Sequence, residues 1–205
     1  MQGLFITLEG TEGAGKSSLI PAIDAFLKSK GLETVCVREP GGTLIAEQIR
    51  AILKTPCPQE KLCDKSELLL MYAARAQLIE TLIKPALAAG KCVICDRHDL
   101  STVAYQGGGR NLPMDEITAI RKVALGDFKP DLTLLLDIDP EIGMQRARSR
   151  GALDRFEQEQ ISFFTRVRNA YLAAAQDSDY IKVIDAANSM DKVKATALGY
   201  IEALL

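Results

Sequence analysis

A glycine-rich segment near the start of the chain carries the residues best suited to chemistry. Residues 10–17 read GTEGAGKS and match the pattern G-x-x-x-x-G-K-[ST]. Glycines let successive backbone N–H groups turn toward phosphate oxygens, and a following helix N-terminus adds partial positive charge. Lys16 can then reach the β- and γ-phosphates, while the Ser17 hydroxyl can ligate Mg²⁺. The segment predicts an ATP site made of Gly10, Thr11, Glu12, Gly13, Ala14, Gly15, Lys16, Ser17 and Ser18.

A second group of charged residues lies outside this loop. Arg38 and Arg97 end two apolar runs, whereas Arg50 and Arg75 lie on helical patterns. Because the carboxyl ends of parallel strands converge on one crevice, Arg38 and Arg97 should approach a common anion. Guanidinium groups suit phosphate because they donate two parallel hydrogen bonds. These arginines predict a second, phosphate-bearing substrate, and Asp96 is placed to orient Mg²⁺ or its water.

A phosphate-binding loop alone is compatible with three classes of protein: a kinase, a GTP-driven switch and a regulatory ATPase. A switch GTPase needs an N/T-K-x-D segment to read guanine, and NSMD at 188–191 lacks the lysine. The choice between kinase and ATPase depends on whether the second substrate has its own site.

The elements that must position these residues alternate along the chain. Apolar runs without polar alternation predict strands that are covered on both faces, at 4–9, 34–39, 92–96, 132–138 and 181–185. Helical spacing of apolar residues predicts helices within 18–31, 44–54, 65–90, 115–127 and 161–176. Pro21 should either kink the first helix or mark a later start. The alternation predicts an α/β fold of the P-loop NTPase type, with a five-stranded parallel sheet between two helical layers.

Length and composition limit the remaining possibilities. A chain of 205 residues, 47% of them hydrophobic, fits a single domain spanning 1–205. The formal charge of −2 gives no cationic excess for nucleic acid, and the apolar runs are too short to span a membrane. Five cysteines without regular spacing fit a cytoplasmic protein. Cys92 and Cys95 lie three apart on a strand, so we interpret them as structural rather than redox or zinc ligands.

Five segments together resemble bacterial thymidylate kinase, in order and over nearly the whole chain. They are LEGTEGAGKSS, REPGGT, LLLMYAARAQ, CDRHDLSTVAYQGGGR and RARSRGALDRFEQE. The resemblance implies transfer of the γ-phosphoryl group from ATP to dTMP, giving dTDP and ADP in dTTP synthesis. It also implies Mg²⁺ with ATP and a homodimer. The alternatives are another small P-loop nucleotide kinase and a regulatory P-loop ATPase.

The resemblance implies roles for residues that face the acceptor phosphate and sugar. Arg38, Arg50 and Arg97 would hold the dTMP phosphate, and Arg97 would also steady the transferring group, so that Lys16 and Arg97 are catalytic. Glu12 would face the 3′-hydroxyl. Tyr105 would close the space that a ribose 2′-hydroxyl needs.

The base would be addressed by Arg75, Thr102 and Gln106. Arg75 would donate to the thymine 4-carbonyl, and because it has no acceptor atom it cannot pair with the amino group of cytosine. The family usually places a stacking phenylalanine where this chain has Met71. The neighbouring ring of Tyr72 is rotated about a third of a turn on a regular helix. We expect Met71 to cover the base less well than an aromatic ring.

The segment 144–159 resembles the lid of the family. Members with an acidic residue at the position of Glu12 take their catalytic arginine from the lid, and the matching residue is Arg150, assisted by Arg155. Lid closure would complete the charge clamp and exclude water. The other interpretation is a charged, solvated helix with ion pairs to its own glutamates.

Three further expectations follow. A phosphate dianion is already a nucleophile, so no catalytic base is needed and His98 should have a packing or hydrogen-bonding role. The adenine site would lie near the lid and residues 185–191. The helix around 66–89 would supply the dimer face or lie in the core.

Overall fold

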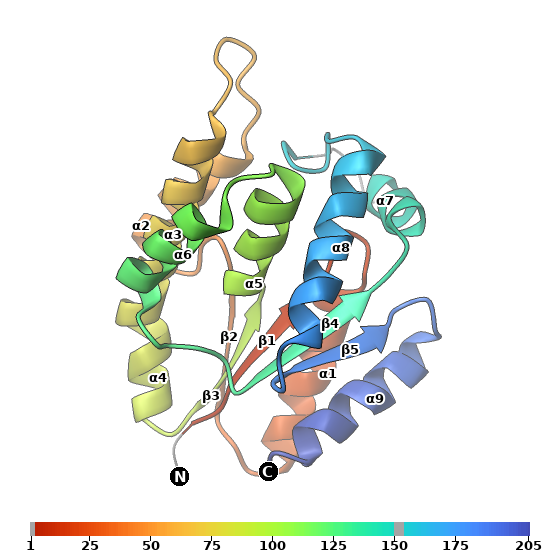
Figure 1. Cartoon of the computed structure of the whole chain (residues 1–205). Coiled ribbons are helices and arrows are strands. Elements are labelled where there is room, and N and C mark those ends of the chain that lie inside the picture. Colours follow the sequence, from red (N-terminus) through yellow and green to blue (C-terminus); the bar gives the residue numbers. More distant parts are fainter. Residues whose placement is uncertain (1–2, 150–153) are drawn as a thin grey trace.

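A parallel five-stranded sheet lies at the centre of the molecule (Figure 1). The structure is a computed structural model, and it describes residues 3–149 and 154–205. The strand order is β2-β3-β1-β4-β5, and every pairing is parallel. The strands are β1 (Phe5–Glu9), β2 (Thr34–Arg38), β3 (Cys92–Asp96), β4 (Leu132–Asp137) and β5 (Ile181–Asp185). Each lies within one residue of its predicted bounds, so the predicted α/β architecture is confirmed.

Helices cover both faces of this sheet (Figure 1). One apolar cluster joins β1, β3, β4 and β5 to α1 and α9, and two others join the opposite face to α3, α6 and α8. The α-helices are α1 (Lys16–Ser29), α2 (Leu44–Lys54), α3 (Asp64–Leu78), α4 (Lys84–Ala88), α5 (Asp99–Thr102), α6 (Met114–Leu125), α7 (Pro140–Arg148), α8 (Ile161–Gln176) and α9 (Met190–Glu202). Two π-helical segments, η1 (Ile79–Ile83) and η2 (Val103–Gly109), continue α3 and α5.

The first and third predicted helices differ in detail from the structure. α1 begins at Lys16 and contains Pro21 in its interior, so the alternative of a later start is wrong. The single long helix expected over 65–90 is a succession of α3, η1 and α4. A π-helical turn shifts the hydrogen-bond register without interrupting the apolar face, and the spacing of side chains gives no sign of it.

Segment 99–109 is helical although its glycines argue against a helix. Its π-helical part packs closely on α8, because a Cβ on Gly108 would lie 2.5 Å from the Cβ of Ala170. A Cβ on Gly109 would lie 2.4 Å from the ring of Phe163. The glycines are therefore explained by close approach between two helices.

Cys92 and Cys95 point to opposite faces of β3. Cys92 belongs to the cluster under α1 and α9, whereas Cys95 belongs to the cluster under α3 and α6. All five cysteines of the chain are free thiols. The structural interpretation of this pair is confirmed.

Within residues 3–149 and 154–205, none of the helices has the length and apolar character needed to cross a membrane.

Candidate active site

A cavity of about 740 Å³ opens at the carboxyl ends of the strands, and we call it the main cavity. Its walls come from the loop after β1, the ends of β2 and β3, α2, α3 and the loop after β5. Most of the predicted site residues line it: Glu12, Gly13, Ala14, Gly15, Lys16, Ser17, Ser18, Arg38, Arg50, Met71, Arg75, Asp96, Arg97, Thr102, Tyr105 and Gln106. Gly10, Thr11 and Arg155 are not part of the described lining. Arg150 lies outside the described residues.

The glycine-rich loop after β1 adopts the conformation that phosphate binding needs. Gly10, Gly13 and Gly15 all have positive φ angles, of 133°, 73° and 96°. At Gly13 the loop also passes close to α7, because a Cβ there would lie 2.1 Å from the carbonyl oxygen of Gly143. Only glycine satisfies both the backbone angle and the approach.

Lys16 is held inside this loop. Its Nζ donates to the carbonyl oxygens of Gly10 and Thr11, at 2.9 Å each. Burial, with a further contribution from the charge of Arg97, lowers the pKa of Lys16 to about 8. The ammonium therefore lies in a desolvated position where a phosphate would stabilise its charge.

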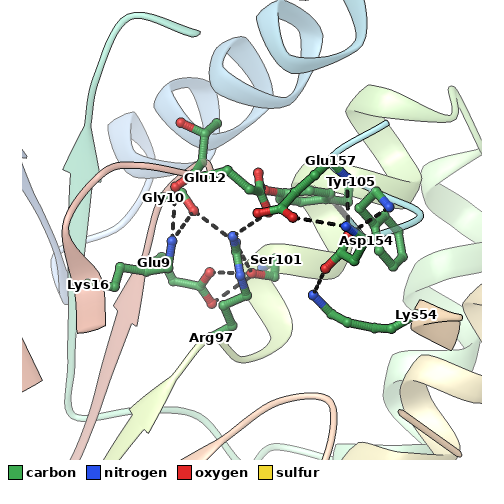
Figure 2. Close-up of polar contacts among 12 residues, drawn as sticks. Glu9, Gly10, Glu12, Lys16, Lys54, Arg97, Ser101, Tyr105, Asp154 and Glu157 are labelled. Carbon is green, nitrogen blue, oxygen red and sulfur yellow. Dashed lines mark hydrogen bonds and ion pairs between the residues drawn. The ribbon is translucent and has the colours of Figure 1, made fainter. Parts of the chain in front are cut away.

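Arg97 lies at the junction of the loop and β3 (Figure 2). Its backbone adopts a left-handed φ of 73°, which places the guanidinium against the loop. Nη1 donates to the carbonyl oxygen of Gly10 at 2.8 Å, and Nη2 donates to Glu12 Oε1 at 2.8 Å. The guanidinium carbon lies 5.0 Å from the ring centroid of Tyr105, whose hydroxyl donates to the other oxygen of Glu12.

A buried carboxylate behind Arg97 fixes the segment that carries it. Glu9 accepts hydrogen bonds from the backbone N–H of His98 at 2.7 Å and from the hydroxyls of Ser101 and Tyr171 at 2.5 and 2.9 Å. Burial raises the pKa of Glu9 above its ordinary value, although these hydrogen bonds oppose the shift. Ser101 and Tyr171 were not predicted. They act through contacts between distant segments, for which the local sequence carries no signal.

Arg75 and Glu39 form a second buried pair. Arg75 Nε donates to Glu39 Oε2 at 2.6 Å, and Nη2 donates to the carbonyl oxygen of His98 at 3.0 Å. The remaining Nη1 makes no hydrogen bond among the described residues, but it forms a longer ion pair with Asp99 Oδ1 at 3.7 Å. Burial opposes ionisation of Glu39, but the Arg75 guanidinium, His98 and the hydrogen bonds from both together keep the pKa of this carboxyl below its ordinary value. Arg75 is thus a buried guanidinium that Glu39 and Asp99 hold at the wall of the main cavity.

His98 lies outside the main cavity and completes this network. Its Nδ1 lies 2.7 Å from Glu39 Oε1, and its ring meets the ring of Phe5 edge to face at 5.0 Å between centroids. The side chain is 1% exposed. The expected packing and hydrogen-bonding role is confirmed.

Of the two candidates for covering a base, Met71 faces the main cavity and Tyr72 does not. Met71 lines the cavity and packs on the cluster that contains Tyr105. Tyr72 is 2% exposed, and its hydroxyl donates to Asp99 at 2.9 Å. Nearby, Gln106 Nε2 donates to Glu67 at 2.6 Å.

Arg38 and Arg50 also line the main cavity. Arg38 pairs with Glu47 through two hydrogen bonds of 2.6 and 3.1 Å, and Arg50 donates to the carbonyl oxygen of Pro40 at 2.7 Å. Both arginines share the cavity wall with Arg97. An anion bound there would compete with Glu47 for Arg38.

Asp96 has a buried oxygen, Oδ1, that lacks a partner in the described part of the chain. A buried carboxylate oxygen without a partner is costly unless a cation or a donor completes it. Together with Ser17 at the start of α1, it offers the hard oxygen ligands that Mg²⁺ prefers.

The described end of the lid segment is bound to α2 and α3. Arg155 Nη1 pairs with Glu67 at 2.6 Å, and Nε donates to the carbonyl oxygen of Leu53 at 2.7 Å. Lys54 pairs with Asp154, as Figure 2 shows. The helix expected to run through Arg150 ends at Arg148 in the described part.

The opposite end of the main cavity is formed by the loop after β5 and the first turns of α9. Its lining includes Ala186, Asn188, Ser189, Met190 and Val193. The predicted adenine region at 185–191 therefore borders the same cavity as the phosphate loop.

The fold and the site define a P-loop phosphotransferase whose phosphate loop shares one cavity with a separate arginine cluster. The thymidylate kinase family model matches residues 8–197, and the chain belongs to this family. It is 55% identical to the thymidylate kinase of Shewanella loihica over 199 residues, which cover 97% of this chain and 94% of that protein. It is 54% identical to the thymidylate kinase of Shewanella sp. strain MR-4 over 98% of this chain and 96% of the relative. The identity to the Shewanella amazonensis thymidylate kinase is 52%, over 99% and 98% of the two chains.

Proposed function

We propose that this protein transfers the γ-phosphoryl group of ATP to dTMP and so forms dTDP and ADP. The observation that carries the proposal is that buried Arg75 lines the same cavity as the phosphate loop and the arginines Arg38, Arg50 and Arg97. Because a guanidinium donates hydrogen bonds and accepts none, it selects a base carbonyl over an amino group. A regulatory ATPase needs no such group, and a kinase for a cytosine or adenine nucleotide would need an acceptor at this position.

Phosphoryl transfer depends here on position and charge rather than on a base. Lys16 neutralises the β- and γ-phosphates, while Arg38 and Arg50 hold the acceptor phosphate. Arg97 lies between the two and stabilises the charge that spreads over the transferring group. The acceptor phosphate is largely a dianion at neutral pH, so its oxygen attacks without proton removal.

Mg²⁺ accompanies ATP in this proposal. Ser17 and Asp96 would hold it, and it would neutralise charge on the phosphates of ATP. The unpartnered Oδ1 of Asp96 supports this assignment.

The sugar is read by Glu12 and Tyr105. Glu12 accepts a hydrogen bond from the 3′-hydroxyl, and the Tyr105 ring excludes a 2′-hydroxyl. Tyr105 is only 6% exposed and makes edge-to-face contacts with Phe156, Phe163 and Tyr171. A ring packed against three others has little room to move for an added oxygen, which supports its role in excluding ribose. The base contacts Arg75, Met71, Thr102 and Gln106.

The lid, about 144–159, closes over the phosphates and excludes water. Arg150 supplies the catalytic charge. Arg155 is the assisting residue, and its ion pair with Glu67 must loosen if it is to reach the phosphates. We therefore expect Arg150→Met to lower kcat by about a hundredfold or more, and Arg155→Met to lower it much less. Equal losses in the two variants would contradict this division of roles.

The enzyme acts as a cytoplasmic homodimer. Five free thiols fit a reducing compartment. Exposed apolar side chains on three neighbouring helices support a self-association face: Leu44, Ile45 and Ile52 on α2, Leu69 on α3 and Val123 on α6.

The test is ADP release from Mg·ATP by the purified protein with dTMP, dUMP, dCMP, the ribose form of TMP, or no acceptor. We expect release mainly with dTMP, matched by equal amounts of dTDP. Preference for another monophosphate would favour a different small nucleotide kinase. Release that ignores every acceptor would favour the regulatory ATPase.

A further inference from the structure

Glu67 is a buried carboxylate on the helix that forms one wall of the main cavity. It lies in the first turn of α3, four residues before Met71 and eight before Arg75. Residues four apart share one face of a helix, so the three side chains project from the same face. Met71 and Arg75 line the main cavity, whereas Glu67 is 0% exposed and is not part of the described lining. Glu67 can therefore act on a ligand only through the residues that it contacts.

Both carboxylate oxygens of Glu67 face groups that only donate hydrogen bonds. Arg155 Nη1 lies 2.6 Å from Oε2. Arg110 donates from Nε to Oε1 and from Nη2 to Oε2, at 3.3 Å each. These guanidinium groups also compensate the buried charge of Glu67, which would be costly if it were unpaired. Glu67 is thus an acceptor at both of its oxygens.

The side-chain amide of Gln106, on η2, is the third group that contacts Glu67. Its Nε2 donates to Glu67 Oε1 at 2.6 Å. The reverse orientation would place the amide oxygen against the carboxylate, with two acceptors and no proton between them. The amide oxygen accepts no hydrogen bond from the described residues, yet it is not among their buried polar atoms without a partner, so it is open to the main cavity that Gln106 lines. Glu67 therefore fixes which end of this amide a ligand meets.

We propose that Glu67 is a positioning residue for base selection, because it holds Gln106 with its acceptor toward the N3 atom of the substrate base. Thymine carries an N–H at N3, beside its 4-carbonyl, whereas N3 of cytosine is an acceptor. An amide oxygen at this position pairs with thymine and repels cytosine, in addition to the choice that Arg75 makes at the 4-position. The inference rests on the proposed function, since it requires the base of dTMP to contact both Arg75 and Gln106.

The variant Glu67→Gln changes the hydrogen-bonding character of this residue and keeps its size. The new amide should keep its oxygen for Arg155, the closer of the two arginines, and turn its amino group to Gln106. Gln106 must then reverse and present its own amino group to the base. We expect the ratio of the Kd for dCMP to the Kd for dTMP to fall about tenfold or more, because thymine then meets a donor at N3.

An exchange of the two side chains separates this role from a structural one. The double variant Glu67→Gln/Gln106→Glu keeps the charge and the size of the pair. The carboxylate at position 106 accepts from the amide at position 67 and still offers an oxygen to the base. We expect the ratio of the two Kd values to return to within about threefold of the wild-type ratio. A purely structural role predicts no recovery, because the exchange does not restore the carboxylate that Arg110 and Arg155 contact.

Both Kd values are measured by calorimetry with the purified full chain and without ATP, so that turnover does not enter. The matched control is Glu116→Gln, which makes the same chemical change on the neighbouring α6, at an ion pair of 3.1 Å with Lys65. Its ratio should equal that of the wild-type protein. An unchanged ratio in Glu67→Gln, an equal fall in Glu116→Gln, or a fall that the exchange does not reverse overturns the proposal. Equal binding of dTMP and dCMP by the wild-type protein would instead contradict the proposed function, and this inference with it.

If Glu67→Gln does not fold, NMR of the Gln106 amide in the wild-type protein decides. On addition of dTMP, the ¹³C resonance of Cδ should shift because the oxygen accepts from the base. The Nε2 proton resonances should move less, because these protons remain with Glu67. The opposite pattern places the amino group of Gln106 against the base and overturns the proposal.

Discussion

Arg75 Nε lies 2.6 Å from a carboxylate oxygen of Glu39, and the two side chains are 2% and 3% exposed. Such a buried pair is costly to break, because removal of one partner leaves an uncompensated charge. Its consequence for function is orientation: Glu39 and the carbonyl oxygen of His98 hold two of the three nitrogens of Arg75, and the third, Nη1, lies 3.7 Å from Asp99 Oδ1.

This relationship predicts how base selectivity can be relaxed. In the double variant Glu39→Gln/Arg75→Gln, no charge is left unpaired, and the glutamine at position 75 can accept from an amino group. We expect the ratio of kcat/KM for dTMP over dCMP to fall about tenfold or more. The single variant Arg75→Gln should instead lose about 3–5 kcal/mol of unfolding free energy, measured by denaturant titration. An unchanged ratio in the folded double variant would contradict the role of Arg75.

Met71 provides a prediction about affinity alone. Met71→Phe places an aromatic ring where the methionine lines the main cavity, and offset stacking adds about 0.5–1.5 kcal/mol. The Kd for dTMP, measured by calorimetry, should fall several-fold. The Kd for ATP serves as the internal control, because the substitution lies away from the phosphate loop. Equal dTMP affinity in both proteins would show that the methionine already covers the base fully.

The sheet was predictable because each strand is covered on both faces and reads as a continuous apolar run. The phosphate loop was predictable because its glycine spacing is a local requirement of backbone geometry. The π-helical segments η1 and η2 were not, since they depend on packing between helices rather than on side-chain period.

The residues that support the site could not be predicted from the sequence either. Glu9, Ser101 and Tyr171 meet only because three distant segments fold together. In contrast, Glu39 directly follows Arg38, which the sequence does place in the site. A glutamate directly after the strand end was therefore a signal that could have been used.

Substitutions at Gly13 and Gly31 can separate the cost of backbone strain from the cost of a steric clash. Gly13→Ala introduces a Cβ 2.1 Å from a backbone oxygen of α7, whereas at Gly31, with a similar φ of 79°, a Cβ meets nothing within 4 Å. Gly31→Ala should cost only the left-handed backbone, roughly 1–2 kcal/mol of unfolding free energy. Gly13→Ala should cost more and also raise the Kd for ATP about tenfold or more, because the loop must move. Equal thermal shifts and unchanged ATP binding would argue against the close fit between the loop and α7.

The proposed dimer face can be tested by charge. Leu69 on α3 is 55% exposed, and Val183 on β5 is 43% exposed and serves as the matched control. Leu69→Lys should convert a dimer into a monomer in sedimentation experiments, because a desolvated, unpaired charge opposes association. Val183→Lys should leave the sedimentation coefficient unchanged. A wild-type monomer, or a dimer that tolerates Leu69→Lys, would contradict the assignment of this face.

The lowered pKa of Lys16 predicts an alkaline loss of ATP affinity in the free protein. Burial brings this pKa to about 8, so the ammonium loses its proton above that pH and no longer attracts phosphate. The ATP dissociation constant should be flat below about pH 7.5 and then rise by up to about tenfold per pH unit. Lys16→Met should bind weakly at every pH, without this dependence. Tyr105, Tyr171 and Cys95 do not lose their protons in this pH range, because burial raises the pKa of each well above its ordinary value.

The lowered pKa of Lys16 weakens ATP binding as the pH rises, but it increases the free energy of unfolding over the same range. Between about pH 8 and 10.5 the folded protein holds Lys16 neutral, whereas the unfolded chain keeps it protonated. Because the unfolded state then binds more protons, this residue makes unfolding free energy rise with pH across that window. Lys16→Met should remove this rise when denaturant midpoints of the two proteins are compared. If ATP affinity stays constant to pH 9.5 or so, or if both proteins show the same stability profile, Lys16 keeps an ordinary pKa in the folded state.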